Sequence, residues 1–128
     1  CTAFLNPTEA SYLRLGEKKA PRYITWSPEN RSPLIRIPAA DSAHRRLEVR
    51  SPDPLANPYL AYALLIHAGL DGIEAGMTPP PPVNGNLFRA DAAVTAKLAE
   101  LPASLSLAQA LAKNSVFIRK YLPDFLAF

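Results

Sequence analysis

The sequence RRLEVR, followed directly by the proline-rich stretch SPDP, alternates between charged and aliphatic side chains. Successive side chains of a β-strand point to opposite faces of its sheet, so this order places Arg46, Glu48 and Arg50 on one face and Leu47 and Val49 on the other. One face of such a strand can pack on an apolar core while the other remains available for chemistry. The alternation therefore predicts a strand with one charged face.

Two upstream runs, RYITW and PLIRIP, are short, rich in β-branched or aromatic residues, and bounded by Pro, Ser and Asn. Runs of this kind are typical of strands. We expect an α+β fold in which short antiparallel strands occupy about 22–50 (22–26, 33–38 and 45–50) and helices follow.

The next segment predicts a helix at about 57–68, with Asn57 as its N-cap, Pro58 at its first position and Gly69 as its stop. Its residues are apolar all round, which predicts burial on most sides. A proline-rich loop should follow at 76–86. A helical tail is expected at 90–122, made of a helix capped by Asp91 and running to about Leu101, one opened by a Ser106–Gln109 capping box, and a third at 115–122.

The composition fits one ordinary globular domain, since the chain has 128 residues, of which 48% are apolar and 20% charged. Its single cysteine, Cys1, excludes an internal disulfide, and no uninterrupted apolar segment reaches the ~18 residues of a membrane span. We expect a cytoplasmic setting and no membrane partner. The chain starts without Met on loop-like residues, which suggests a piece of something longer.

Positive charge is concentrated in the predicted strands, where five arginines accompany Glu48: Arg31, Arg36, Arg45, Arg46 and Arg50. A nucleic-acid surface would show a basic stripe with interleaved aromatic residues, so we expect no nucleic-acid partner. Arginine's planar fork suits phosphate and carboxylate oxygens, which favours a compact anion site. Glu48 fits two roles equally well on this pattern, an ion-pair partner or a metal ligand.

Four blocks carry a resemblance to a known family: NPTEASYLRL, NRSPLIRIP, RRLEVRSPDPLANPYLAYALLIHAGLDGI and NGNLF. In order and spacing they resemble the C-terminal part of the catalytic domain of type I bacterial glutamine synthetases, over most of the chain and more weakly after about position 90. The resemblance implies an ATP-dependent glutamate–ammonia ligase that uses Mg²⁺ or Mn²⁺ and passes through γ-glutamyl phosphate. It also implies a much longer enzyme, whose N-terminal part is missing here, and a homo-oligomeric ring, expected to be a dodecamer.

The resemblance also implies residue roles. Arg14 would hold the α-carboxylate of the substrate glutamate. Arg31 and Arg36 would contact the ATP phosphates and the transferring phosphoryl group, and Arg46 the nucleotide.

Two further roles belong to the third strand. There Glu48 would be a metal ligand, and Arg50 would contact the phosphoryl group. Positioning and stabilisation of spread negative charge are what a phosphoryl-transfer site needs.

The sequence GEKKAP departs from the family's flap sequence GYEAP, whose glutamate closes the site and helps to deprotonate ammonium. Aligned from Ala20 and Pro21, the flap glutamate position is Lys19, while Glu17 lies two residues earlier. Either Glu17 substitutes through a loop shift, or the flap chemistry is changed. A catalytically silent relative that keeps the anion site, and a relative that ligates other amines, are therefore alternatives to the ammonia ligase, and the chain alone is expected to be inactive.

Overall fold

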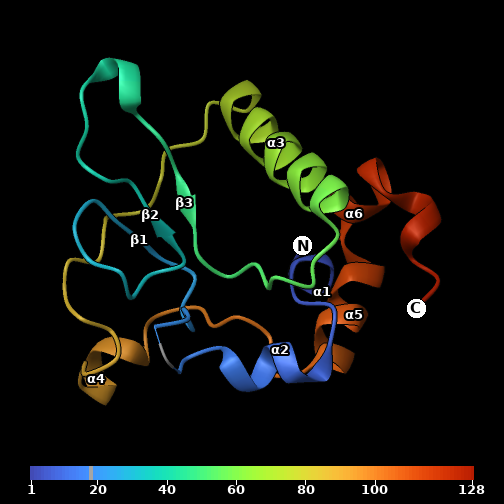
Figure 1. The fold of residues 1–128 in the computed structure, drawn as a ribbon, viewed down its shortest axis with the longest axis horizontal. Coiled ribbons are helices and arrows are strands. Elements are labelled where there is room, and N and C mark those ends of the chain that lie inside the picture. The colour runs from blue at the N-terminus through green and yellow to red at the C-terminus, as the bar shows by residue number, and fades with distance from the viewer. Residues whose placement is uncertain (18) are drawn as a thin grey trace. The chain divides into compact units, whose positions relative to one another are not determined.

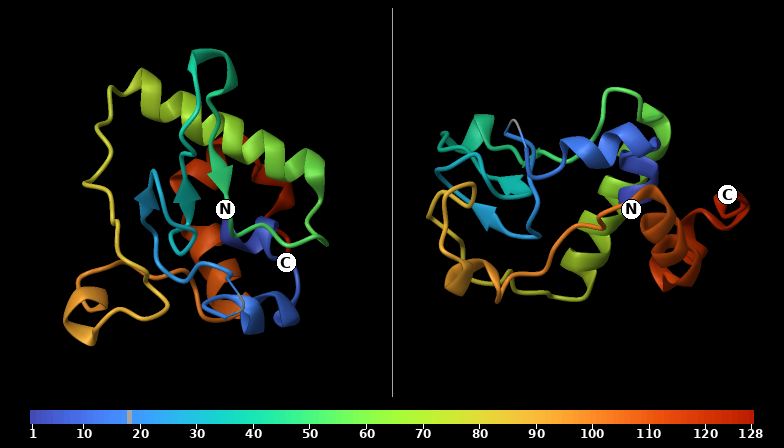
Figure 2. Two further views of the ribbon diagram at one scale, coloured as in Figure 1. Left: turned by 60° about the vertical axis from the view of Figure 1, so that its left-hand side comes forward. Right: turned by 90° about the horizontal axis from the view of Figure 1, so that it is seen from below.

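The computed structural model describes residues 1–17 and 19–128, which form two compact units. The helical unit comprises Cys1–Tyr12, Pro52–Pro79 and Pro102–Phe128. The sheet unit comprises Leu13–Ser51 and Pro80–Leu101 (Figures 1 and 2). None of the described helices is both long and apolar enough to cross a membrane.

The sheet unit contains three short strands in the order β1 (Trp26–Ser27), β2 (Ile35–Arg36) and β3 (Glu48–Val49). All three lie within the predicted range of 22–50. The β2–β3 pair is antiparallel, with Arg36 directly opposite Glu48, but β1 and β2 run parallel, so the prediction of antiparallel pairing was wrong for that pair. Hydrogen bonds involving buried serines hold the turn that leaves β1. After this turn β2 runs in the same direction as β1, so the two strands do not form a hairpin.

The strands are also shorter than predicted, and proline explains the end of the β2–β3 ladder. Continuing the observed register would place Arg46 opposite Pro38. Because proline has no backbone N–H, it cannot donate to the ladder. Arg46 therefore lies outside β3.

The helical unit contains α1 (Thr2–Leu5), α3 (Pro58–Glu74), α5 (Leu105–Asn114) and α6 (Val116–Tyr121), and α2 (Glu9–Arg14) crosses from this unit into the other. Helix α1 packs against α3 and α5, and α5 against α6. The apolar core of the unit is made by Ala3, Phe4, Leu5, Leu64, Ala108, Ala112, Ile118 and Leu122.

Helix α3 begins as predicted, because the Asn57 side chain accepts hydrogen bonds from the N–H groups of Tyr59 and Leu60 (3.0 and 3.4 Å). Its predicted end at Gly69 was wrong. The helix continues to Glu74, and it is Gly76 that adopts the positive φ of +60° that ends many helices. Gly69 costs the helix only about 1 kcal/mol relative to alanine, so a single glycine is a weak stop.

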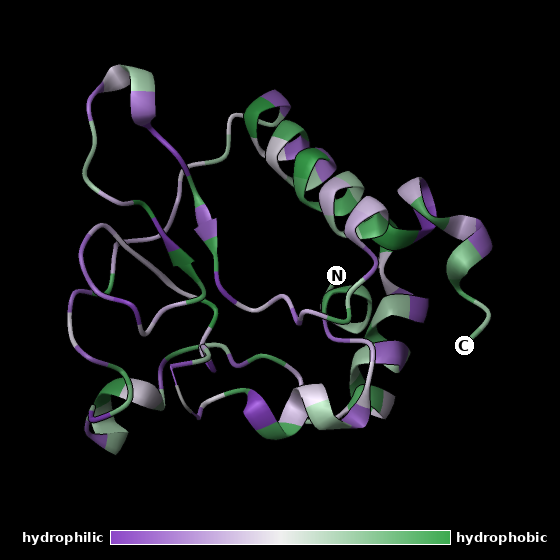
Figure 3. Ribbon diagram, in the orientation of Figure 1, coloured by the Kyte–Doolittle hydropathy of each residue, from purple (hydrophilic) through white to green (hydrophobic). Residues whose placement is uncertain are grey.

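Burial of α3 on most sides was also not observed. Leu64 is its one buried residue, and Tyr59, Tyr62, Ile66, Leu70 and Ile73 are all exposed. Figure 3 shows hydrophobic residues recurring along α3, interspersed with polar ones. The other segments of the helical unit therefore cover only part of the apolar surface of α3.

The C-terminal segments follow the predicted order with shifted boundaries. Asp91 precedes α4 (Ala92–Thr95), but that helix stops well before Leu101, whose N–H donates to the carbonyl of Arg22 at 2.8 Å. Ser104, and not Ser106, caps α5 by accepting a hydrogen bond from the N–H of Leu107. The third helix, α6, is confirmed, and the proline-rich loop contains no helix or strand over 77–86.

Candidate functional site

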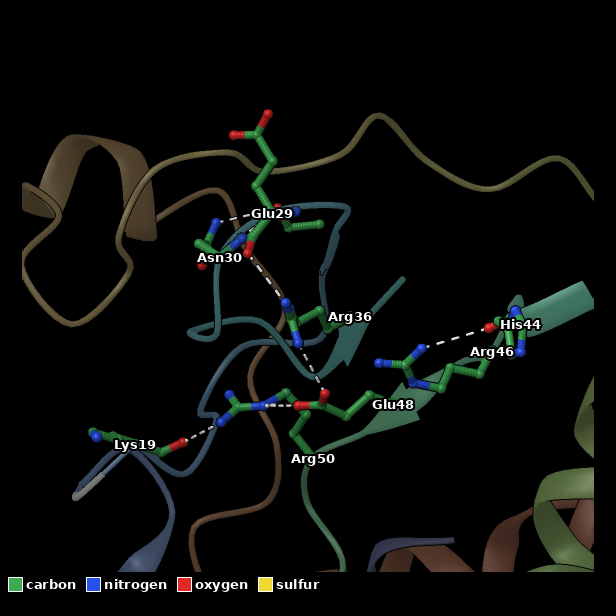
Figure 4. A network of polar contacts seen from close by, with 9 residues as sticks. Lys19, Glu29, Asn30, Arg36, His44, Arg46, Glu48 and Arg50 are labelled. Carbon is green, nitrogen blue, oxygen red and sulfur yellow. Dashed lines mark hydrogen bonds and ion pairs between the residues drawn. The ribbon is translucent and has the colours of Figure 1, made fainter. Parts of the chain in front are cut away.

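Three of the predicted residues meet on adjacent strands of the sheet unit (Figure 4). Arg36 of β2 donates from Nη1 to Oε2 of Glu48 at 3.1 Å, and Arg50 donates from Nε to Oε1 of Glu48 at 2.9 Å. Each carboxylate oxygen therefore receives one arginine. We call Arg36, Glu48 and Arg50 the arginine–glutamate cluster.

The cluster is partly shielded from water. The side chains of Arg36 and Arg50 are only 19% and 12% exposed, whereas that of Glu48 is 38% exposed. Burial by itself opposes ionisation of Glu48, but hydrogen bonds from Arg36 and Arg50 and their positive charges together outweigh it, so the pKa of Glu48 lies below its ordinary value. The carboxylate is thus ionised at neutral pH, and two positive charges face one negative charge.

Both arginines extend beyond the glutamate to backbone carbonyls. Arg50 donates from Nη2 to the carbonyl of Lys19 at 3.1 Å, and Arg36 donates from Nε to the carbonyl of Glu29 at 3.4 Å. Nη1 of Arg50 is buried and meets no acceptor within the described residues. A buried guanidinium nitrogen without an acceptor is costly, so this atom is ready to receive an anionic oxygen.

The structure does not bring Arg46 into the cluster. Arg46 is exposed and donates from Nη1 to the carbonyl of His44 at 3.5 Å, and within the described residues no hydrogen bond joins it to Glu48 (Figure 4). Arg31 is exposed on the turn between β1 and β2, and it makes no hydrogen bond or ion pair in the described part of the chain. Its guanidinium therefore has all its donors available.

The two N-terminal candidates lie in and after α2. Arg14, at the end of α2, donates from Nη2 to the carbonyl of Ser51, the residue that follows Arg50. Glu17 is exposed in the next turn, and among the described residues its backbone alone is hydrogen bonded, to Arg14 and Ala20. It is Lys19 of this turn, with a φ of +73°, that reaches the cluster, and it does so through its carbonyl.

Sequence reasoning missed a set of polar side chains around Arg31. Ser27, Asn30 and Ser32 form hydrogen bonds with one another and with residues 83–87, which are distant in sequence. The one local signal was the placement of Asn and Ser on either side of Arg31, because both residue types favour turns that bond their own backbone.

The chemistry of the donors limits what metal this part of the chain can hold. Hard dications such as Mg²⁺ are held by about six oxygen ligands, including carboxylates. No group of three or more His, Cys, Asp or Glu suited to a metal ion occurs among residues 1–17 and 19–128. Glu48 can thus supply a single carboxylate, and a complete metal site needs further ligands from outside these residues.

Comparison with known proteins identifies the family. The model of "Glutamine synthetase, catalytic domain" matches residues 1–127. A glutamine synthetase of Methanosarcina mazei is 44% identical over 126 residues, covering 96% of this chain and 28% of that protein. A glutamine synthetase of Staphylococcus aureus strain MW2 is 43% identical over 124 residues, covering 94% of this chain and 28% of that protein.

A solved structure, described as "GmaS/ADP complex-Conformation 1", superposes with a TM-score of 0.80 at 34% sequence identity, over 94% of this chain and 28% of that one. The chain thus spans little more than a quarter of the length of these relatives. The match in sequence and the match in fold agree. This α+β chain belongs to the glutamine synthetase catalytic-domain family.

Proposed function

We propose that the chain forms the phosphate-contacting part of an ATP-dependent glutamate–ammonia ligase and corresponds to the C-terminal portion of the catalytic domain of a type I bacterial glutamine synthetase. The reaction joins glutamate and ammonia, with ATP converted to ADP and phosphate through γ-glutamyl phosphate. The observation that carries the proposal is the arginine–glutamate cluster. In this partly shielded site positive charge exceeds negative charge, and a buried nitrogen of Arg50 lacks an acceptor among the residues that the structure describes.

In this proposal the arginines act by placing and stabilising phosphate oxygens. The γ-carboxylate of glutamate attacks the terminal phosphorus of ATP and ADP leaves, so negative charge spreads over the transferring phosphoryl group. Arg36 and Arg50 are held in fixed positions by Glu48 and by backbone carbonyls, so they require little reorganisation as this charge develops. Arg31, whose donors are available, completes the contacts to the phosphates.

The other assignments rest on family resemblance together with position. Arg46 contacts the nucleotide, and the ADP in the "GmaS/ADP complex" relative supports a nucleotide in this family. Arg14 binds the α-carboxylate of glutamate. The second step, attack of ammonia on the γ-carbonyl with release of phosphate, requires loss of a proton, for which Glu17 is the candidate in this chain.

Glu48 is proposed as a ligand of one Mg²⁺ or Mn²⁺, and such an ion would neutralise phosphate charge beside the two arginines. In the structure both oxygens of Glu48 accept from arginine, and each oxygen retains a second acceptor position. One carboxylate of this kind fits a shared site to which the remainder of the protein contributes. The remainder is thus a partner of this chain, within a homo-oligomeric ring, proposed to be a dodecamer in the cytoplasm.

A silent or amine-ligating relative is the second candidate, and one observation favours it. Lys19 occupies the position of the flap glutamate and reaches the cluster only through its carbonyl, while Glu17 is exposed with no side-chain hydrogen bond in the described residues. The group that would accept the ammonium proton is therefore not held at the site.

The test is an assay of the full-length protein for phosphate and glutamine release with ATP, glutamate and ammonia, repeated with methylamine and with a polyamine. We expect turnover with ammonia. Turnover only with another amine would support the amine ligase, and ATP binding without turnover would support the silent relative. Residues 1–128 alone are expected to show no γ-glutamyl transfer with Mn²⁺, and measurable turnover would contradict the assignment of the chain as a part of the site.

A further inference from the structure

The turn between β1 and β2 (residues 27–32) carries Arg31 and lies against the end of the proline-rich loop (residues 80–87) within the sheet unit. The indole N–H of Trp26 donates to the carbonyl of Pro80 at 2.7 Å, and the N–H of Val83 donates to the carbonyl of Trp26 at 2.9 Å. Two hydrogen bonds thus attach the loop to Trp26 of β1.

Asn30 uses both ends of its carboxamide, Oδ1 within the turn and Nδ2 to the loop. Oδ1 accepts from the N–H and the hydroxyl of Ser32, at 2.9 and 2.6 Å. Nδ2 donates to the carbonyl of Val83 at 3.1 Å and to the hydroxyl of Ser27 at 3.2 Å. One side chain therefore closes the turn on one side of Arg31 and joins it to the loop on the other.

The two serines are buried, so the network is strongly coupled. Ser27 and Ser32 are 0% and 3% exposed, and the hydroxyl of Ser32 also accepts from the N–H of the buried Leu87 at 2.9 Å. Buried polar groups are stable only when hydrogen bonded, and loss of one member leaves its partners unsatisfied. We call Ser27, Asn30 and Ser32 the turn network.

The turn network affects two arginines, Arg31 in the turn and Arg36 on β2. Arg31 stands between Asn30 and Ser32, so its backbone position is set by the hydrogen bonds of its two neighbours. Arg36 donates to the carbonyl of Glu29, the residue before Asn30. Displacement of the turn would move the carbonyl that holds Arg36 and the whole side chain of Arg31.

We propose that Asn30 is a positioning residue for nucleotide binding: it holds the turn against residues 80–87 and thereby places Arg31 and Arg36 at the ATP phosphates. This inference rests on the proposed function. It gives the proline-rich loop a role that its composition did not indicate, because the loop supplies the Val83 carbonyl against which the turn is set.

The test uses Asn30→Asp in the full-length protein. The substitution keeps an acceptor for Ser32 but replaces the Nδ2 donor with an oxygen that faces the Val83 carbonyl. We expect KM for ATP to rise about tenfold or more, equivalent to at least one strong hydrogen bond, while KM for glutamate stays unchanged. Asn114→Asp is the matched control, because Asn114 is exposed on α5 and its side chain donates to the carbonyl of Ala110 in the same helix; we expect no change in either KM.

A double-mutant cycle with Arg31→Ala separates positioning from general stability. If Asn30 acts through Arg31, Asn30→Asp raises KM for ATP much less in the Arg31→Ala background. Equal effects in both backgrounds would overturn the placement of Arg31 by Asn30, and unchanged KM for ATP in Asn30→Asp would overturn the whole inference. Should Asn30→Asp fold poorly, Ser32→Ala replaces it in the same cycle.

Two further measurements keep this inference separate from the proposed function. Calorimetric titration with ATP measures binding without turnover, so weaker ATP binding by Asn30→Asp supports the inference even in an inactive protein. If the protein makes glutamine but Asn30→Asp binds ATP as tightly as the unchanged protein, the inference is refuted while the proposed function stands. Emission of Trp26, the one tryptophan of residues 1–128, reports contact with Pro80 and is expected to change in Asn30→Asp but not in Asn114→Asp.

Discussion

Two carboxylates in this chain each accept hydrogen bonds from two donors, yet their surroundings differ. Glu48 in the sheet unit accepts hydrogen bonds from Arg36 and Arg50, one on each carboxylate oxygen. Asp71 in the helical unit accepts hydrogen bonds from Lys120 (3.1 Å) and from the hydroxyl of Tyr121, both on Oδ1. In both cases the pKa of the carboxyl lies below its ordinary value. For Glu48, burial raises the pKa, but the hydrogen bonds and charges of the two arginines together outweigh it. For Asp71 the largest cause of the lowered pKa is the hydrogen bond from the Tyr121 hydroxyl.

The donors distinguish the two clusters better than the carboxylates do. Around Glu48 the arginines are largely buried, reach backbone carbonyls as well, and leave one buried nitrogen of Arg50 without an acceptor among the described residues. Around Asp71 the lysine is 56% exposed, and Tyr121 stacks on His67 with ring centroids 3.9 Å apart. The comparison teaches that spare, shielded donors indicate an anion site, whereas a perturbed carboxyl alone does not.

The largest effect is expected from Glu48→Gln in the full-length protein. The change removes the carboxylate that holds Arg36 and Arg50 and leaves their charges uncompensated in a partly shielded site. We expect the rate of glutamine formation to fall at least about 100-fold, the scale of losing one preorganised electrostatic group. A rate close to that of the unchanged protein would remove Glu48 from the site.

A smaller loss is expected from Arg50→Lys. Lysine keeps the charge, but its compact ammonium cannot reproduce the planar fork that reaches Glu48, the Lys19 carbonyl and an incoming oxygen. We expect kcat to fall about tenfold or more, equivalent to one charge-assisted hydrogen bond. Arg45→Lys is the control, since Arg45 is exposed and outside the cluster; equal losses in both variants would contradict a requirement for the fork.

The pH dependence of the cluster follows from the lowered pKa of Glu48. A depressed folded-state pKa means that ionised Glu48 stabilises the fold fully at pH values above its ordinary pKa of 4.5, and that this stabilisation is lost as the pH falls through the lower folded-state value. Carboxyl-carbon NMR is expected to show Glu48 titrating below 4.5 and, in Arg36→Gln, at a higher pH. An unchanged or lower pKa in Arg36→Gln would contradict the pairing.

The smallest effect is expected from Asp71→Asn. Asp71 pairs with an exposed lysine, and exposed ion pairs contribute little to stability. We expect activity within about twofold of the unchanged protein and only a slight fall in melting temperature. A loss of activity comparable to that of Glu48→Gln would show that the two clusters do not differ as proposed.

The sequence predicted where the arginine–glutamate cluster lies, but not which arginines contact Glu48. Alternation in RRLEVR placed Arg46, Glu48 and Arg50 together, and two of these three meet in the structure. Arg46 does not, because Pro38 ends the ladder before the strand reaches it, and that fact depends on the register with β2. The pairing of Arg36 with Glu48 follows from the same register and could not be read from either strand alone.

Helix boundaries show the same division. Asn57 followed by Pro58 is a local signal, and the start of α3 was predicted correctly. At the other end the sequence predicted Gly69 as the stop, whereas the structure shows that Gly76 has the positive φ. The burial of α3 was predicted from its own residues, yet exposure depends on what packs against it, and one residue, Leu64, is buried.

By itself, the sequence determined the family, the concentration of arginines around Glu48, the order of the segments after α2, and the Asn57 cap that begins α3. These features arise from residues that are close together in the chain. The tertiary structure decided which arginines meet Glu48, why β1 and β2 run parallel, and how Asn30 joins the turn of Arg31 to Val83, 53 residues away. Such choices depend on hydrogen bonds between partly buried groups distant in sequence, whose partners are specified only when the chain has folded.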